Sequence, residues 1–208
     1  MEYDAKVKRA TFINRSVEVR ETFKFASPVE VLHSLKVYCS SFYGCMLWDL
    51  AGNGAEQVFN AWTTAVKLSW AVPRATRTYL VQQVLSAGLT SAKVDILARF
   101  GNFFRSLRLS PCYEVAVMAN LVGRDIRSIT GSNIRLVQDS SGLDPWVTSP
   151  AHLKAGLIAK QQVNIEREDM WRVKYLGTLL GQRQELHYLG YETEKLRVNE
   201  LIDSLCLN

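Results

Sequence analysis

Residues 27–48 read SPVEVLHSLKVYCSSFYGCMLW, and this stretch predicts how the chain folds. Ser27 followed by Pro28 is typical of a helix start. The serine oxygen accepts a hydrogen bond from a free N–H group of the first turn, and proline itself has no N–H group that would need a partner there. Glu30 completes a capping box with Ser27. Apolar residues then recur at helical spacing, namely Val31, Leu35, Tyr38, Phe42, Cys45 and Met46. A helix is therefore expected from Pro28 to about Trp48.

Helix signals continue along the rest of the 208 residues. Ser110-Pro111 and Ser149-Pro150 repeat the Ser-Pro start, and Thr90 is the expected cap of a long helix. Gly52-Asn53-Gly54 is the expected end of the first helix. The further helices are expected at about 55–70, 76–86, 90–107, 111–127, 133–137, 150–160, 165–187 and 192–205. Residues 22–26 are the single stretch whose alternating pattern suggests extended structure.

The expected fold is all-α, with a main helical bundle followed by a smaller C-terminal helical unit. Residues 1–26 are the expected connector into the bundle, which covers residues 27–137. Residues 138–149 are rich in turn formers and are the expected linker, with Trp146 as the single aromatic side chain that can hold it against the body. The C-terminal helical unit is expected over residues 150–208.

The positive charge of the chain is concentrated in one region. The net charge is +5, and residues 57–113 contain seven basic residues and one acidic residue, Asp95. The basic residues are Lys67, Arg74, Arg77, Lys93, Arg99, Arg105 and Arg108. Such a region favours a nucleic acid or another polyanion as partner. A solvated helical face in a slightly basic protein explains the same pattern.

Several classes of protein and site have no support in the sequence. No apolar stretch is long enough to span a membrane and the first residues do not form a secretory signal, so an intracellular protein, in the cytoplasm or nucleus, is expected. The cysteines and histidines lack metal-ligand spacing, and no metal or other cofactor is expected. Cys39, Cys45 and Cys206 have apolar neighbours typical of buried, reduced thiols. No phosphate-binding loop or catalytic triad motif occurs, so no catalytic residue is assigned.

The segment from Trp70 to Tyr79, WAVPRATRTY, has the most specific pattern in the chain. Arg74 and Arg77 flank a turn fixed by Pro73, at the expected start of a helix. Arginine side chains match phosphate oxygens, free N–H groups at a helix start add donors, and aromatic rings stack on bases or sugars. The segment is therefore a candidate contact with a nucleic-acid backbone. A corner between two helices with solvated arginines fits the same spacing.

Three segments, in order along the chain, resemble one protein family. They are residues 42–50 (FYGCMLWDL), 59–62 (FNAW) and 72–79 (VPRATRTY). They are similar to the region after the catalytic palm in reverse transcriptases of non-LTR retrotransposons, the Jockey-like branches of the LINE class, where two helices and a Val-Pro turn form the thumb. Residues 9–13 resemble the connector that leaves the palm, and residues 123–128 and 130–133 resemble the part after the thumb. The resemblance covers residues 9–137 and thins out after Pro150.

The resemblance implies a fragment that binds nucleic acid but does not polymerise it. The family's Tyr/Phe-x-Asp-Asp catalytic centre does not occur in this sequence, and no enzyme activity is expected. Thumbs of this family hold a primer–template duplex through its backbone. The expected partner is therefore an RNA–DNA hybrid or RNA.

The residues expected to contact or attract phosphates are Arg74, Arg77, Lys67, Lys93, Arg105 and Arg108. Trp70 and Tyr79 are expected beside them as packing or stacking supports. Tyr43, Gly44 and Trp48 are assigned to the core, where Gly44 lets a neighbouring helix approach. The alternative function is a helical module for protein–protein interaction, self-association or docking to other polymerase domains, whose mark is a large exposed apolar patch.

Overall fold

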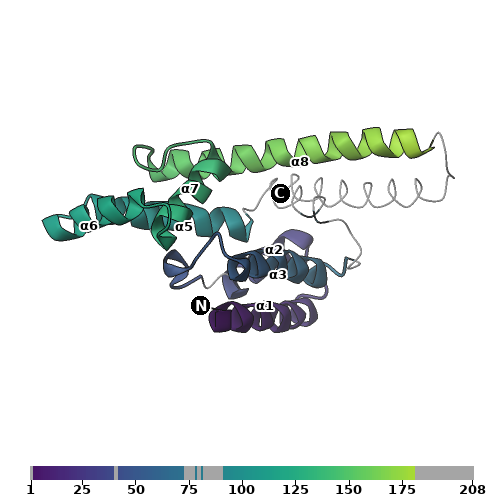
Figure 1. Ribbon diagram of the computed structural model, residues 1–208. Helices are drawn as coiled ribbons and strands as arrows, with labels where there is room; N and C mark the ends of the chain where they lie inside the picture. The colour runs from purple at the N-terminus through teal and green to yellow at the C-terminus, as the bar shows by residue number, and fades with distance from the viewer. Residues whose placement is uncertain (1, 40–41, 73–77, 79–80, 82–90, 181–208) are drawn as a thin grey trace.

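The computed structural model describes residues 2–39, 42–72, 78, 81 and 91–180 (Figure 1). Its elements are α1 (Glu2–Thr22), α2 (Pro28–Cys39), the 3-10 helix η1 (Cys45–Leu47), α3 (Asn53–Ser69), α5 (Ala92–Arg108), α6 (Tyr113–Arg124), α7 (Ile129–Ser141) and α8 (Pro150–Leu180). No strand occurs among the described residues, which confirms the all-α fold class. None of the described helices combines the length and the apolar composition that a membrane crossing requires.

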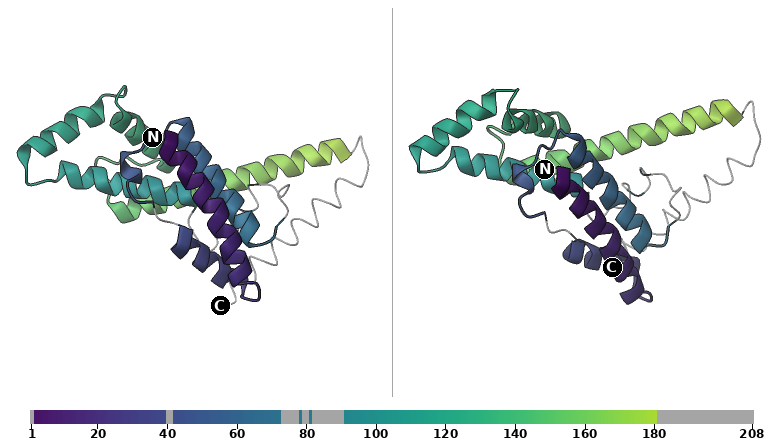
Figure 2. Two further views of the ribbon diagram at one scale, coloured as in Figure 1. Left: turned by 90° about the horizontal axis from the view of Figure 1, so that it is seen from below. Right: turned by 60° about the horizontal axis from the view of Figure 1, so that its bottom comes forward.

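The helices form two groups. In the first group α1 packs along α3, and α2 contacts both of them (Figures 1 and 2). In the second group α8 runs across α5 and α7, and α6 lies at one end of the molecule (Figures 1 and 2). Contacts of α5 with η1 and with α3 join the two groups.

Two aromatic clusters mark the hydrophobic core. The rings of Phe12 of α1, Trp62 of α3 and Phe42, which lies between α2 and η1, meet edge to face. Their centroids are 5.7 to 6.1 Å apart. Phe104 of α5 meets Trp146 edge to face at 5.0 Å. One continuous set of buried side chains links the two clusters and extends into the first half of α8.

The helix starts at residues 28 and 150 lie where the sequence predicts them. Ser27 and Glu30 form the predicted capping box: the Ser27 N–H donates to Glu30 Oε2 at 2.8 Å, and the Glu30 N–H donates to Ser27 Oγ at 3.3 Å. At the start of α8, Ser149 Oγ accepts a hydrogen bond from the His152 N–H at 3.4 Å. These caps satisfy N–H groups that have no partner within the helix.

Two other helix starts differ from the prediction. Ser91, and not Thr90, caps α5, because its Oγ accepts the N–H three residues further along at 3.3 Å. α6 begins at Tyr113 rather than directly after Ser110, whose Oγ instead accepts the Cys112 N–H at 3.2 Å. The serine signals therefore locate the turns but misplace the first helical residue.

The helix predicted to reach Trp48 is shorter, since α2 ends at Cys39. Phe42 and Cys45 are buried at positions that continue its apolar spacing, but they lie in a turn and in η1. Gly44 precedes η1 with a φ of 76°, in the left-handed region that glycine adopts at little cost. No described atom lies within 4 Å of a Cβ placed there, so the predicted role of Gly44 in close helix packing is wrong.

The N-terminal residues contain a helix that the sequence analysis does not predict. α1 buries Phe12, Ser16 and Val19. This buried stripe is narrow, and one of its residues, Ser16, is polar. Residues 23–26 form turns, so the extended structure predicted there is wrong. Gly52-Asn53-Gly54 opens α3 with Gly52 as its N-cap, instead of ending the preceding helix.

The predicted linker is partly helical, because α7 runs to Ser141 and Gly142 caps it with a φ of 70°. Trp146 holds the following residues against the core, as predicted. The helix predicted over 111–127 ends earlier, at Arg124, and its buried residues are Ala119 and Gly123.

α8 continues without a break through residues 160–165, where two separate helices are predicted. This polar segment contains neither Gly nor Pro, and the buried Ile165 continues the stripe of Leu153 and Leu157 along the helix. The helix predicted over 76–86 lies largely outside the described residues, and the one over 192–205 entirely so.

Cys39 and Cys45 are buried free thiols, as predicted. Burial raises the pKa of the Cys39 thiol to about 11 and also raises the pKa of Cys45. Both side chains therefore stay protonated at neutral pH and pack as small apolar groups. Cys206 lies outside the described residues.

Candidate nucleic-acid interface

Among the described residues, the predicted phosphate contacts Lys67, Lys93, Arg105 and Arg108 do not line one common cavity or groove. Arg74 and Arg77 lie outside the described residues, and so does Tyr79. Lys67 belongs to α3 and is only 8% exposed, so the prediction that it widens an exposed basic surface is wrong. Trp70 is the C-cap of α3 and packs partly buried against the core, as a packing support does.

Two of the residues assigned to the core occupy other positions. Tyr43 is 90% exposed, because its neighbour Phe42 takes the buried position in the turn. Gly44 serves the backbone conformation of that turn. Trp48 does pack against the core, and its carbonyl accepts a hydrogen bond from Asn133 Nδ2 at 2.7 Å. The core assignment is therefore confirmed for Trp48 and wrong for Tyr43.

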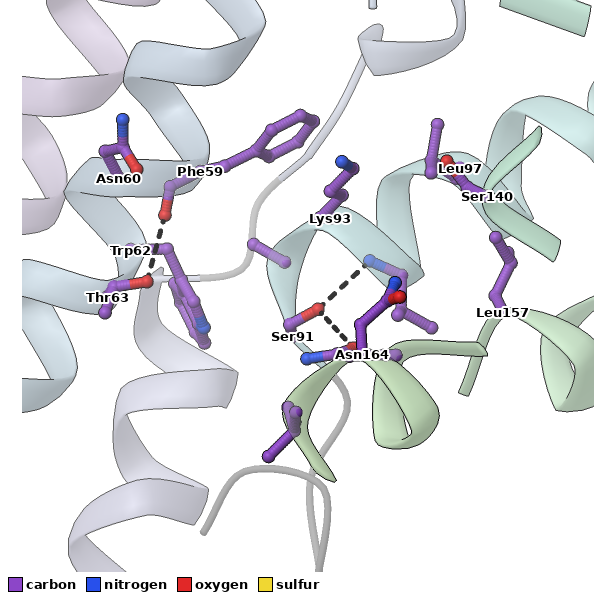
Figure 3. A pocket seen from close by; sticks show the side chains of 14 residues that line it. Phe59, Asn60, Trp62, Thr63, Ser91, Lys93, Leu97, Ser140, Leu157 and Asn164 are labelled. Atoms are coloured by element: carbon purple, nitrogen blue, oxygen red, sulfur yellow. Dashed lines mark hydrogen bonds between the residues drawn. The ribbon is translucent and has the colours of Figure 1, made fainter. Parts of the chain in front are cut away.

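Lys93 is exposed in the first turn of α5, at the opposite end of this helix from Arg105 and Arg108. Its Nζ is 5.9 Å from the centre of the Phe59 ring. Lys93 borders a cavity of about 230 Å³ between α3, the start of α5 and α8 (Figure 3). No other charged side chain is among the described residues that line this cavity. The cavity therefore does not gather the predicted cations.

Arg105 and Arg108, in the last turn of α5, hold the loop between α7 and α8. Arg105 Nη1 donates to the carbonyl of Thr148 at 3.2 Å. Arg108 Nη1 donates to the carbonyl of Trp146, and its guanidinium carbon lies 4.7 Å from the centre of the Trp146 ring. Arg108 Nε also donates to Asn120 Oδ1 at 3.3 Å. These two arginines are thus positioned by the fold and are not simply solvated.

Arg108 also lines a groove together with two arginines from other helices. The groove has a volume of about 460 Å³ and lies between the end of α5, α6 and α7. Arg124, in the last turn of α6, and Arg135 of α7 are both exposed and line it. We call this set of three residues the arginine groove. No acidic side chain is among the described residues that line it.

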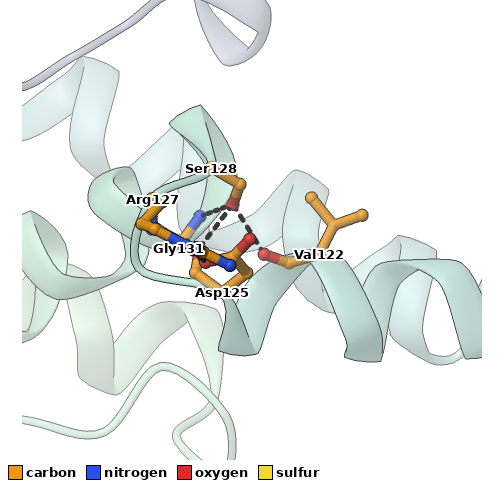
Figure 4. A network of polar contacts seen from close by, with 5 residues as sticks. All are labelled: Val122, Asp125, Arg127, Ser128 and Gly131. Atoms are coloured by element: carbon orange, nitrogen blue, oxygen red, sulfur yellow. Dashed lines mark hydrogen bonds and ion pairs between the residues drawn. The ribbon is translucent and has the colours of Figure 1, made fainter.

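A polar network in the turn between α6 and α7 fixes the relative position of these two helices (Figure 4). Ser128 Oγ accepts the Gly131 N–H at 2.9 Å and lies 2.7 Å from the carbonyl oxygens of Val122 and Asp125, to either of which it can donate. The Asp125 carboxylate accepts hydrogen bonds from the backbone N–H and Nε of Arg127, at 3.0 and 3.2 Å. Asp125 is therefore paired outside the groove.

Close packing at Gly123 brings α6 against the core beneath the groove. A Cβ at this position would lie 2.7 Å from Phe104 Cζ and 2.9 Å from both Ile134 Cδ1 and Trp146 Cη2. Glycine is the one residue that permits this approach without a shift of its neighbours. It lets α6 pack close enough for Arg124 and Trp146 to line the same groove.

The arrangement suits a phosphate-bearing ligand. Guanidinium groups from three helices can donate paired hydrogen bonds to phosphate oxygens. Trp146 adds an aromatic surface, and Asn120 and Gln138 add amide groups to the lining. No group of three or more His, Cys, Asp or Glu side chains in the described ranges has an arrangement that could hold a metal ion.

The sequence analysis missed Arg124 and Arg135. Residues 113–149 contain these two arginines and Arg127, but four acidic residues balance them, so a count of local charge shows no excess there. Only the packing of α6 and α7 onto the end of α5 places the three arginines of the groove together. Arg108 lies within the predicted basic region, residues 57–113, whereas Arg124 and Arg135 lie outside it.

No family model matches this chain, and no curated protein or solved structure is similar to it by the comparisons made.

Proposed function

We propose that this protein binds the phosphate backbone of a nucleic acid, an RNA–DNA hybrid or RNA, in the arginine groove. The observation that carries the proposal is the convergence of Arg108, Arg124 and Arg135 on one groove with no acidic side chain among its described lining residues. Because like charges repel, such a cluster favours an anionic ligand.

The three arginines differ in how they are held. Arg108 has its guanidinium over the Trp146 ring and bonded to the Asn120 side chain, so it is already positioned for a ligand. Arg124 and Arg135 are exposed side chains that can turn toward successive phosphates. Arg108 would therefore anchor one phosphate, while the other two arginines follow the backbone.

The resemblance to a reverse-transcriptase thumb supports the same kind of partner, since thumbs hold a duplex through its backbone. In this proposal the chain binds without polymerising. Arg74, Arg77, Lys93 and Arg105 remain predicted phosphate contacts in addition to the arginine groove. Their contribution to the binding affinity depends on their positive charge more than on precise geometry, and it does not depend on the sequence of the nucleic acid.

Fluorescence anisotropy with a short labelled RNA–DNA hybrid tests the proposal. The variant Arg124→Gln/Arg135→Gln should weaken binding by at least about tenfold, because it removes two charge-assisted contacts. The control variant Arg9→Gln/Arg20→Gln removes the same charge from exposed positions on α1 and should change the affinity much less. Equal losses in the two variants would contradict a localised site in the groove.

A further inference from the structure

α6 lies at one end of the molecule (Figures 1 and 2) and has exposed apolar side chains. Met118 and Leu121 are 57% and 62% exposed, although they belong to one of the more apolar helices of the fold. Val117 lies on the same face and is partly buried. Apolar residues close to α6 in the chain are exposed as well, namely Leu109, Tyr113, Ile126 and Ile129. Met118 and Leu121 are three residues apart and therefore adjacent on one face of α6, unlike the scattered single apolar side chains that are normal on a protein surface.

The charges at the two ends of this face are opposite. Glu114, Val117, Met118 and Leu121 are spaced three and four residues apart, so they form one seam along α6. Arg124 continues the seam one turn beyond Leu121. The seam therefore has an acidic residue in the first turn of the helix, apolar residues in the middle and a basic residue in the last turn.

Both charged residues of the seam can interact with a partner. Glu114 is exposed, and its pKa is lowered by a hydrogen bond from its own backbone N–H and by one from the Cys112 thiol, whose Sγ is 3.1 Å from Glu114 Oε2. It is therefore ionised at neutral pH. Arg124 is exposed as well.

We infer that α6 pairs with α6 of a second copy of this chain in an antiparallel arrangement. A two-fold axis near residue 119 would place Glu114 of each copy beside Arg124 of the other, with Val117, Met118 and Leu121 packed between the helices. A parallel arrangement would bring like charges together at both ends and is unfavourable. Antiparallel helices also align their dipoles favourably.

The contact is small, so the pairing should be weak. A helix of 12 residues is about 18 Å long at 1.5 Å per residue, which is short for a stable dimer interface. We therefore expect association in the micromolar range or weaker, roughly 10 to 100 µM. This inference does not rest on the proposed nucleic-acid binding, although both use Arg124.

Sedimentation experiments over a range of concentrations with charge-reversal variants test the pairing. The wild-type chain should shift from monomer to dimer as its concentration rises through this range. Glu114→Arg and Arg124→Glu should each remain monomeric, because each places like charges at both ends of the seam. An equimolar mixture of the two variants should form a dimer again, because every charged pair across the seam is then opposite in sign.

Val37→Arg is the matched control, since Val37 is an exposed apolar residue on α2, 71% exposed, far along the chain from α6. It should associate like the wild type. A wild-type chain that stays monomeric at about ten times the expected dissociation constant would overturn the inference. Unchanged association of Glu114→Arg, or a mixture that stays monomeric, would overturn it as well. Because Glu114 does not line the arginine groove, its variant tests the pairing separately from nucleic-acid binding.

Discussion

Asn133 connects two parts of the chain that are far apart in sequence. Its side chain is buried; Oδ1 accepts the Leu50 N–H at 2.8 Å, and Nδ2 donates to the Trp48 carbonyl at 2.7 Å. It therefore ties α7, which carries Arg135 of the arginine groove, to the segment between η1 and α3. A side-chain amide is well suited to this position, because it supplies one donor and one acceptor on the same group.

We predict that Asn133→Ala lowers the free energy of unfolding by about 2 to 4 kcal/mol, because it leaves a buried N–H and a carbonyl without partners. Urea denaturation followed by circular dichroism measures this loss. Asn102→Ala, at an exposed position on α5, should change stability by less than about 0.5 kcal/mol. A similar small effect for Asn133→Ala would mean that this link does not stabilise the fold.

The aromatic cluster of α1 and α3 provides a second prediction at this scale. Phe12 is fully buried and meets Phe42 and Trp62 edge to face. Phe12→Ala should lower the free energy of unfolding by about 3 to 5 kcal/mol, through lost apolar burial and the cavity left behind. Phe25→Ala, at a residue 95% exposed, should have almost no effect in the same denaturation experiment. Comparable effects of the two substitutions would contradict the packing of α1 on α3.

At the scale of the helices, the capping box at the start of α2 gives a prediction about pH. The pKa of Glu30 is lowered from 4.5, first by the hydrogen bond from the Ser27 backbone N–H and then by that from the Ser27 hydroxyl. A carboxyl whose pKa is lower in the folded state stabilises that state above its unfolded pKa, and the contribution is lost as the pH falls through the folded value. The contribution of Glu30 should therefore disappear as the pH drops below about 4.5.

Nuclear magnetic resonance of the Glu30 carboxyl carbon against pH measures this directly. The midpoint should lie below that of a glutamate in a short unstructured peptide, and Ser27→Ala should raise it part of the way back by removing the hydroxyl donor. Coinciding midpoints for Glu30 in the folded chain and for the peptide glutamate would show that the capping box does not form in solution.

Sequence signals predicted where helices begin better than where they end. The Ser27-Pro28 and Ser149-Pro150 starts are local capping chemistry, readable from a few residues. The end of α2 could not be predicted from the sequence, because the buried residues Phe42 and Cys45 continue the helical spacing of apolar residues beyond the last helical residue. α1 was missed for the opposite reason, since its stability comes from packing on α3 and its own apolar stripe is narrow.

On the scale of the whole molecule, the all-α class could be predicted, but only one of the three residues of the arginine groove was. Charge counted along the sequence pointed to residues 57–113, where the structure buries Lys67 and sets Lys93 apart. Arg108 is shared between the prediction and the groove. Its partners, Arg124 and Arg135, are invisible to such a count, because acidic neighbours in the sequence cancel their charge although they do not line the groove.

The salt dependence of binding to an RNA–DNA hybrid tests the central claim most directly. Counterion release gives a slope of roughly −0.9 in log K against log salt for each phosphate neutralised, so the three groove arginines should contribute about −3 to the slope. In Arg124→Gln/Arg135→Gln the slope should become less steep by about 2, and in Arg9→Gln/Arg20→Gln it should stay near the wild-type value. Binding that does not respond to salt, or an identical slope in the wild type and the groove variant, would contradict a phosphate-binding groove.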